Sequence, residues 1–217
     1  MELLLFLPPL LLAVVVHEVA HAWMALRQGD DTAARLGRLT LNPLRHLEPF
    51  GSFLVPLALW ATNAPFLFGW AKPVPVDPRN FRDYRRGDVL VSLAGPASNF
   101  VLGAASIVAA VAFVWLGRVA PPIEGSAAFL ADMARFSVFI NVLLGIFNLL
   151  PIPPLDGSHV LYHLLPPDLG RAYRHAGRFG ILLLVGLFLL APGLFEVLLW
   201  PVTAIDRVAL DVIRIAT

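Results

Sequence analysis

The stretch LLLFLPPLLLAVVVHEVAHAWMAL, residues 3–26, decides the fold class of this chain. It is apolar enough, and long enough as a helix, to cross a bilayer core of roughly 30 Å. Three ionisable side chains, those of His17, Glu18 and His21, interrupt its second half. Ionisable groups inside a membrane segment are energetically expensive, so where they occur they usually serve a function. The stretch therefore predicts a transmembrane helix that carries a functional site.

The composition of the whole chain agrees with a membrane protein. Of its 217 residues, 58% are hydrophobic and only 14% are charged, and the mean hydropathy is +0.76. A soluble domain carries about 25% charged residues. The apolar excess is gathered in long blocks, and the polar segments between them are too short to build a second core. We therefore predict a single integral membrane domain over residues 1–217, with no removable signal peptide.

Four more apolar blocks follow the first, at about residues 51–68, 89–116, 127–150 and 179–200. Together they predict an all-α membrane protein, a bundle of about four to six transmembrane helices. The block at 51–68 is short and contains two prolines, so the sequence does not decide whether it spans the membrane. The tail at 201–217 alternates apolar and charged residues, which is typical of an amphipathic helix on the membrane surface.

The connections between the blocks contain a proline-rich segment and clusters of basic residues. In FGWAKPVPVDP, residues 68–78, prolines at every second or third position predict a short extended or β segment near residues 69–78. Lys and Arg cluster after the first, second and fourth blocks, whereas residues 117–126 hold a single Arg. The positive-inside rule places the three basic segments in the cytoplasm. This orientation favours a re-entrant or interfacial block at 51–68 and a site displaced toward the cytoplasmic face.

The sequence His17-Glu18-Val19-Ala20-His21 has the H-E-x-x-H pattern of zinc hydrolases. Two histidines four apart lie on one face of a helix, where both can bind one zinc ion. Glu18 can reach a metal-bound water and act as general base. The alternative, a pair of ordinary histidines, is disfavoured by the cost of ionisable groups in a membrane. A catalytic zinc needs a third protein ligand, and the chain has no cysteine to provide it.

Asp156 is the best candidate for the third ligand. It follows NLLPIPPL, residues 148–155, whose three prolines break the helix of the fourth block. Irregular backbone at membrane depth is tolerated where it is buried in protein or lines a polar cavity. An ordinary solvated Asp in a Pro-Gly turn is the alternative. Under the predicted orientation Asp156 lies at the cytoplasmic end, as the histidines do, whereas Glu196 lies at the opposite end.

Taken together, HEVAH at 17–21 and NLLPIPPLDG at 148–157 resemble the site-2 protease family of intramembrane zinc metalloproteases. FGWAKPVPV at 68–76 and AGPASN at 94–99 resemble its short prokaryotic branch, which lacks a PDZ or CBS domain. The resemblance covers about residues 14–165. It implies one zinc ion held by His17, His21 and Asp156, with Glu18 as the general base.

Several other polar residues stand in apolar surroundings or near these motifs. Asn148 can polarise the scissile carbonyl or hold the developing oxyanion, or it can join two helices; the resemblance favours the first role. Asn99 is expected mainly to cap or join helices. His46 could lie near the site, but a loop histidine is expected to titrate in water. His159 and His163 could form a second metal-binding pair, but they are expected to flank the site or an interface.

These features predict an intramembrane zinc metalloprotease that carries out regulated intramembrane proteolysis of transmembrane protein substrates in the cell membrane. The alternative is a membrane metal transporter, or a metal-binding relative without catalytic activity. A transporter does not need a carboxylate directly after the first ligand, and it often shows internal repeats, which this sequence lacks. The net charge of +1 indicates no nucleic-acid partner. The substrate, the regulatory signal and the formation of a homo-oligomer stay open.

Overall fold

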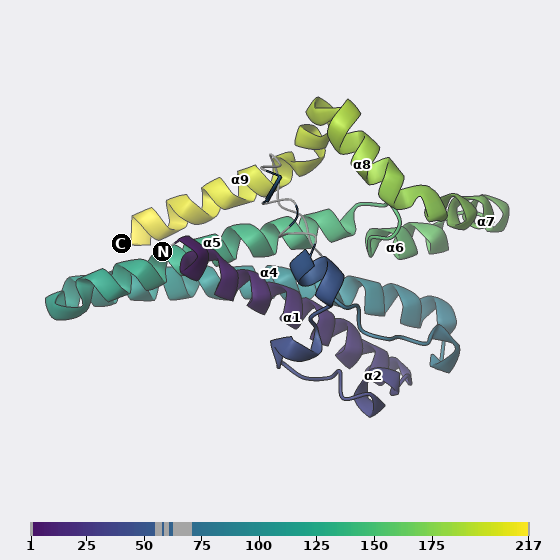
Figure 1. Ribbon diagram of the computed structural model, residues 1–217, viewed down its shortest axis with the longest axis horizontal. Coiled ribbons are helices and arrows are strands. Elements are labelled where there is room, and N and C mark those ends of the chain that lie inside the picture. The colour runs from purple at the N-terminus through teal and green to yellow at the C-terminus, as the bar shows by residue number, and fades with distance from the viewer. Residues whose placement is uncertain (1, 55–57, 59–60, 63–70, 217) are drawn as a thin grey trace.

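The computed structural model describes residues 2–54, 58, 61–62 and 71–216 (Figure 1). It is 82% helical and has no strand within the described residues, which confirms the predicted all-α membrane bundle. The α-helices are α1 (Glu2–Gln28), α2 (Thr32–Arg35), α4 (Tyr84–Val119), α5 (Glu124–Leu149), α6 (Gly157–Leu164), α7 (Pro167–Ala176), α8 (Gly180–Leu190) and α9 (Pro192–Ala216). Short turns of 3-10 or π helix lie between them: η1 (Pro43–Arg45), η2 (Pro49–Leu54), η3 (Pro78–Asn80), η4 (Pro121–Ile123) and η5 (Gly177–Phe179).

Three helices of the described residues are long and apolar enough to cross a membrane. They are α1 from Leu5 onward, α4, and α5 together with the turn η4 before it. α1 and α4 contain the predicted blocks at 3–26 and 89–116, and α5 contains the block at 127–150 except for its last residue. The sequence predicted about four to six spans for the whole chain, but most of the block at 51–68 lies outside the described residues.

The last predicted block, residues 179–200, is divided between α8 and α9. Ala191 separates them, with φ −136° and ψ 56°. A residue that precedes proline is disfavoured in the helical region, and Pro192 follows Ala191 directly. The break leaves α8 with 11 residues, too few to cross a bilayer core alone.

The predicted amphipathic tail is the C-terminal part of α9. Val202, Ala209 and Ile213 form its buried face, which packs on apolar side chains of α5 and, at Ile213, of α4. Arg207 and Asp211 point away from that face and are exposed. Protein therefore covers one apolar face of this helix, whereas other apolar side chains of the tail, including Val208 and Ile215, are exposed.

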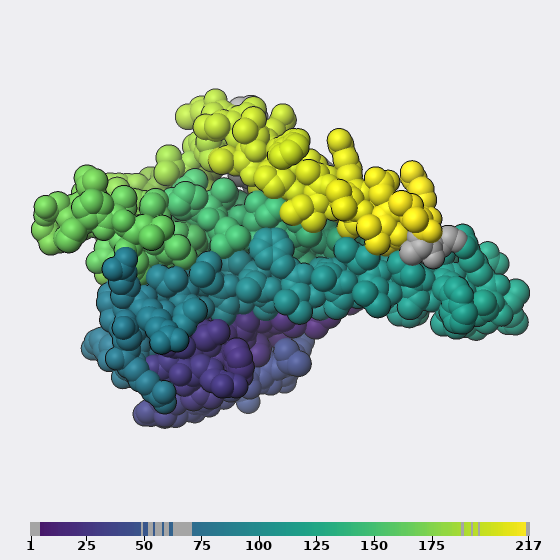
Figure 2. All heavy atoms as spheres, turned by 180° about the vertical axis from the view of Figure 1, so that it is seen from behind, coloured from purple at the N-terminus to yellow at the C-terminus, as the bar shows by residue number. Residues whose placement is uncertain are grey.

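The bundle is organised around the antiparallel pair α4 and α5. α1 packs on one side of this pair and α9 on the other, as both views show (Figure 1, Figure 2). Helices approach closely where small side chains face a neighbour. α4 provides such a stripe, since Gly95, Gly103, Ser106 and Ala110 are all buried. α4 therefore contacts the helices before and after it in the chain at short range.

Residues 71–77 contain neither helix nor strand, and residues 69–70 lie outside the described residues. The N–H of Lys72 donates to the carbonyl oxygen of His46 at 2.8 Å. The N–H of Asp77 donates to the carboxylate of Asp30, also at 2.8 Å. Arg38 donates to the Lys72 carbonyl at 2.8 Å. The segment is therefore fixed to the chain that follows α1. The prediction that it is not helical is confirmed, but residues 71–77 do not form a β strand.

Candidate metal centre

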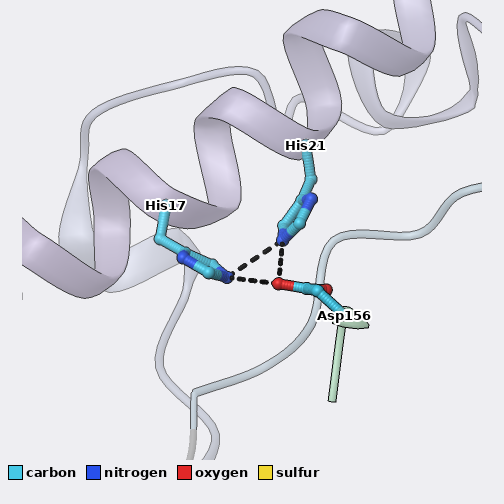
Figure 3. A group of neighbouring side chains, drawn as sticks. All are labelled: His17, His21 and Asp156. Atoms are coloured by element: carbon cyan, nitrogen blue, oxygen red, sulfur yellow. Dashed lines mark hydrogen bonds and ion pairs between the residues drawn. The ribbon is translucent and has the colours of Figure 1, made fainter. Parts of the chain in front are cut away.

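His17 and His21 project from one side of α1, because residues four apart in a helix lie one turn above each other. Their Nε2 atoms face each other at 2.9 Å. One carboxylate oxygen of Asp156, Oδ2, lies 3.3 Å from the first Nε2 and 3.4 Å from the second. Figure 3 shows the three side chains converging on one point. Among the described residues, this is the one cluster of three or more side chains close enough to hold a metal ion.

The other nitrogen of each imidazole is held by an acceptor on α4. Nδ1 of His17 lies 2.6 Å from Oδ1 of Asn99, and Nδ1 of His21 lies 2.7 Å from the carbonyl oxygen of Val91. An oxygen acceptor requires the proton on Nδ1, so each Nε2 carries a lone pair. Metal-binding histidines are usually oriented in this way by a second hydrogen bond.

The atoms that meet between these side chains are therefore all acceptors. Asp156 Oδ2 is buried, and no hydrogen-bond donor within the described residues reaches it. Two imidazole lone pairs and a carboxylate oxygen repel each other unless a cation lies between them. Neutral imidazole and carboxylate are the ligands that zinc takes in sites without cysteine. The donor set therefore fits a zinc ion with three protein ligands.

Asp156 reaches the histidines because the chain reverses directly after α5. α5 ends at Leu149, and Asp156 precedes the first residue of α6. A Cβ on Gly157 would lie 2.1 Å from the carbonyl oxygen of Leu149, so the turn requires glycine at this position. The helix-breaking prolines and Gly157 explain how a residue far along the sequence approaches α1.

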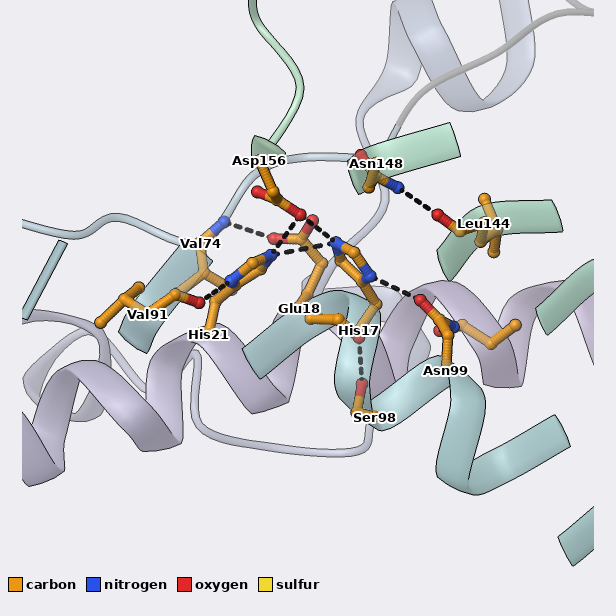
Figure 4. A network of polar contacts seen from close by, with 12 residues as sticks. His17, Glu18, His21, Val74, Val91, Ser98, Asn99, Leu144, Asn148 and Asp156 are labelled. Atoms are coloured by element: carbon orange, nitrogen blue, oxygen red, sulfur yellow. Dashed lines mark hydrogen bonds and ion pairs between the residues drawn. The ribbon is translucent and has the colours of Figure 1, made fainter. Parts of the chain in front are cut away.

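Glu18 lies beside this cluster, and its carboxylate is bound by the segment at 71–77 (Figure 4). The backbone N–H of Val74 donates to Oε2 of Glu18 at 2.7 Å. The carboxylate is therefore directed by a backbone donor from another part of the chain. The sequence did not predict this contact, because it depends on how residues 71–77 pack against α1.

Gly95 of α4 lies against both imidazoles. A Cβ at this position would lie 2.4 Å from Nε2 of His21 and 2.6 Å from Nε2 of His17. Real Cβ atoms do not approach other atoms so closely. The histidine pair therefore needs the space that glycine leaves on α4.

Two asparagines differ in how their predicted roles relate to the site. Asn99 was expected mainly to join or cap helices, but its side chain accepts a hydrogen bond from His17, a predicted ligand. Asn148 lies at the end of α5 near Asp156 (Figure 4). Its amide nitrogen donates to the carbonyl oxygen of Leu144 at 3.0 Å, a bond within its own helix. The predicted role of Asn148 toward substrate stays a prediction.

The remaining histidines that the sequence singled out have structural partners. His46 is buried, with 1% of its surface exposed, so it is not the water-exposed loop histidine that the sequence predicted. Its Nε2 donates to the carbonyl oxygen of Thr40 at 2.8 Å. His159 and His163 both contact the carboxylate of Asp88 on α4, at 3.1 Å and 2.7 Å. These contacts hold α6, and with it the turn that carries Asp156, against α4.

The contact between His159 and Asp88 predicts a pH dependence of stability. The hydrogen bond to Asp88 raises the pKa of His159 above 6.5, while burial and Arg174 oppose the rise and Asp156 adds to it. A histidine whose pKa is higher in the folded state than in the unfolded state stabilises the fold. Its contribution is fully present below about pH 6.5, the unfolded-state pKa, and disappears as pH rises through the folded-state pKa. We expect the melting temperature of the zinc-loaded protein to fall between pH 6 and pH 8.5 by about 2–4 °C more than that of His159→Asn. Equal pH dependence of these two proteins, with exposed His175→Asn as the control, would contradict the assignment.

Comparison with known proteins places these features in a family. The chain is 39% identical over 201 residues to a protein of Bacillus subtilis (strain 168) named "Putative zinc metalloprotease YwhC", covering 91% of this chain and 85% of the relative. It is also similar to two proteins named "Putative zinc metalloprotease Rip2", from Mycolicibacterium smegmatis and Mycobacterium tuberculosis (strain ATCC 25618 / H37Rv). Their identities over 194 residues are 34% and 36%, and each alignment covers 88% of this chain and 70% of the relative.

The family model described as Peptidase family M50 matches residues 116–191, which include Asn148 and Asp156. No solved structure gives a significant match. The similarity to the curated relatives extends over nearly the whole chain. The chain therefore belongs to peptidase family M50, the site-2 protease family of zinc metalloproteases.

Proposed function

We propose that this protein is an intramembrane zinc metalloprotease that hydrolyses peptide bonds of transmembrane protein substrates. The observation that carries the proposal is the convergence of Asp156 with His17 and His21 beside the carboxylate of Glu18. The two histidines and Glu18 belong to a helix long and apolar enough to cross a membrane. Ionisable groups at such a position are usually functional. Family membership supports the hydrolytic reading over a purely structural one.

In this proposal His17, His21 and Asp156 would hold one zinc ion. The bound ion would lower the pKa of water toward 7 and polarise the carbonyl group of the substrate. Glu18 accepts the proton of the attacking water and passes it to the leaving amine. Because the Val74 N–H already binds Oε2, Oε1 is the oxygen that exchanges this proton. The N–H keeps the carboxylate in place while its charge changes.

Asn148 is proposed to stabilise the oxygen of the reacting carbonyl. Its amide nitrogen has two hydrogens, and the bond to Leu144 uses one of them. The second is available to an oxyanion, whose stabilisation contributes strongly to acyl-transfer reactions. A role in joining helices is less well supported, since the bond to Leu144 lies within α5.

The site is proposed to open toward the cytoplasm in a multi-pass protein of the cell membrane. His17 and His21 lie in the second half of α1, and Asp156 follows the end of α5, so the site lies toward one end of the bundle. Basic residues gather in the segments at this same end, which the positive-inside rule assigns to the cytoplasm. Water can reach the site from this face without crossing the bilayer.

A substrate must unwind before its peptide bonds can be attacked, and residues 71–77 are proposed to pair with the unwound strand. Pro73 and Pro75 have no N–H, and the N–H of Val74 binds Glu18. The N–H of Val76 is therefore the donor that this part of the segment can offer to a substrate. Proline at 74 would also release Glu18, so position 76 gives the cleaner test.

We expect Val76→Pro to lower kcat/KM for a membrane substrate by roughly 2- to 12-fold, the effect of one hydrogen bond worth about 0.5–1.5 kcal/mol. Val76→Ala is the matched control, since it removes the same apolar packing and keeps the N–H. Cleavage rates and zinc content would be measured for both variants. An equal loss of activity in the two variants would show that the effect comes from packing, and it would refute the proposed pairing of this segment with the substrate.

The proposed function is tested with purified protein in liposomes that also contain single-span membrane proteins. We expect cleavage of such a protein within or at the edge of its span, loss of cleavage with a zinc chelator, and recovery when zinc is restored. Zinc movement across the same liposomes is measured in parallel. Zinc transport without cleavage would favour the transporter alternative, and zinc binding with neither activity would favour a non-catalytic relative.

A further inference from the structure

Two asparagines extend from His17 into the contact between α4 and α5. Asn99 of α4 and Asn141 of α5 are fully buried, each with 0% of its surface exposed. Nδ2 of Asn99 donates to Oδ1 of Asn141 at 2.9 Å. Neither helix needs these polar side chains for apolar packing, and buried amides are tolerated only when they are hydrogen-bonded. The pair therefore connects His17, a predicted metal ligand on α1, to α5 by hydrogen bonds.

The direction of each hydrogen bond in this chain follows from its far end. The backbone carbonyl of Ser137 can only accept, and the amide of Asn141 lies 2.8 Å from it. The nitrogen of Asn141 must therefore face Ser137, and its oxygen must face Asn99. The nitrogen of Asn99 consequently faces Asn141, where it also reaches the carbonyl oxygen of Ala13 at 3.2 Å. The oxygen of Asn99 is left to face His17.

The orientation of Asn99 decides which nitrogen of His17 carries the proton. With Oδ1 toward the ring, Nδ1 is the donor and Nε2 keeps the lone pair that faces His21 and Asp156. A rotated amide would direct N–H toward Nδ1 and move the proton to Nε2. A protonated Nε2 cannot bind a metal ion.

We infer that Asn141 is a positioning residue for the metal site, which fixes the metal-binding tautomer of His17 through the amide of Asn99. This inference rests on the proposed zinc site, because the tautomer matters only if Nε2 binds a metal. Ala13 provides a second acceptor for Asn99, but at 3.2 Å it is the longer of the two bonds. Asn141 is therefore the stronger constraint on the amide.

Asn141→Leu tests the inference, because leucine has a similar volume and cannot bind Asn99 or Ser137. Mutation of a residue that hydrogen-bonds to a metal ligand typically lowers metal affinity by about 10–100-fold. For Asn141→Leu we expect a loss of zinc affinity near the lower end of that range. Zinc affinity is measured by competition with a chelator. Val138→Ala is the matched control: Val138 is buried on the same helix, one turn away, and its truncation should weaken packing without changing zinc affinity.

A double-mutant cycle separates positioning from simple helix contact. If Asn141 acts through Asn99, the zinc affinity of Asn99→Ala/Asn141→Leu equals that of Asn99→Ala alone. In addition, nitrogen NMR shifts of the His17 ring in zinc-free protein should show a proton on Nδ1 in the wild type and a mixture of tautomers in Asn141→Leu. Additive losses in the cycle, or an unchanged tautomer, would overturn the inference. Asn141→Ala serves the same measurements if the leucine variant does not fold.

Failure of this inference is distinguishable from failure of the proposed function. Wild-type protein that binds no zinc would refute the proposed metal site itself. If the wild type binds zinc and Asn141→Leu binds it equally well, only the role of Asn141 is refuted, and the proposed metal site stands. Ser137→Ala provides a further check, since it removes the hydroxyl and keeps the backbone carbonyl that orients Asn141. Its zinc affinity should match the wild type.

Discussion

Replacement of Glu18 by glutamine is expected to slow peptide-bond cleavage by about 10²–10⁴-fold, the usual contribution of a general base. The amide oxygen of glutamine can still accept the N–H of Val74, so the side chain should keep its position. It has no basic oxygen that can take a proton from water. Zinc content should stay at the wild-type level, because Glu18 is not among the three side chains that converge.

The measurement is the initial cleavage rate of a single-span substrate, with zinc content determined on the same samples. Glu124→Gln is the matched control, since Glu124 is an exposed carboxylate at the start of α5, far along the chain from the site. Cleavage by Glu18→Gln at the wild-type rate would refute the general-base role. Loss of zinc together with activity would instead assign Glu18 a role in binding the ion.

Gly95→Ala is expected to lower zinc affinity by about 10- to 100-fold. A Cβ at this position would lie 2.4 Å from Nε2 of His21, so at least one imidazole must move. Overpacking of a well-packed site costs about 1–3 kcal/mol, a factor of roughly 5 to 150 in affinity, and the expected loss lies within this range. Alanine favours a helix over glycine by about 0.8–1.0 kcal/mol, so α4 itself should not be weakened. The loss of zinc should therefore occur without a comparable loss of stability.

Gly103→Ala is the control for this prediction. Gly103 lies two turns further along the buried stripe of α4, where the nearest neighbour of a new Cβ would be 3.6 Å away. That distance is an ordinary contact, so zinc affinity and melting temperature should both stay close to the wild type. If Gly95→Ala binds zinc as tightly as Gly103→Ala, the close approach of α4 to the histidines is not needed for the site.

The candidate ligands could be proposed from the sequence because part of the signal is local. His17 and His21 share a face of any helix at their spacing, and a helix in this stretch follows from its apolar length. Asp156 could be proposed because prolines and Gly157 break the chain where a polar residue would otherwise lie at membrane depth. For Asp156 this local rule left an ordinary Pro-Gly turn as an alternative, and the resemblance to the site-2 protease family favoured the role of a ligand.

The groups that orient the ligands could not be predicted, because they act between helices. Asp88, Val91, Gly95 and Asn99 recur at helical spacing along one face of α4, and each contacts α1 or α6. Their roles depend on which face of α4 meets α1, and a single sequence does not specify that packing. Asn99 did carry a signal, an amide in an apolar helix, but the same signal fits a residue that only joins helices.

The division of the last apolar block has a cause that is visible in the sequence. Pro192 disfavours a helical conformation at Ala191, and this local effect outweighs the continuous apolar character of residues 179–200. The packed face of α9 was also not predictable in detail. Alternating polar and apolar residues indicate an amphipathic helix, but they do not say whether protein or lipid covers the apolar face.

The proposed metal site requires that Asp156 share one cation with the two histidines. The decisive measurement is the zinc content of purified wild-type protein and of Asp156→Ala, with Asp168→Ala on exposed α7 as the control. We expect about one zinc per chain in the wild type and in the control, since a catalytic site of this kind holds one ion through three protein ligands. Asp156→Ala should lose most of its zinc on dialysis against a weak chelator. Retention of zinc by Asp156→Ala at wild-type affinity would contradict the account.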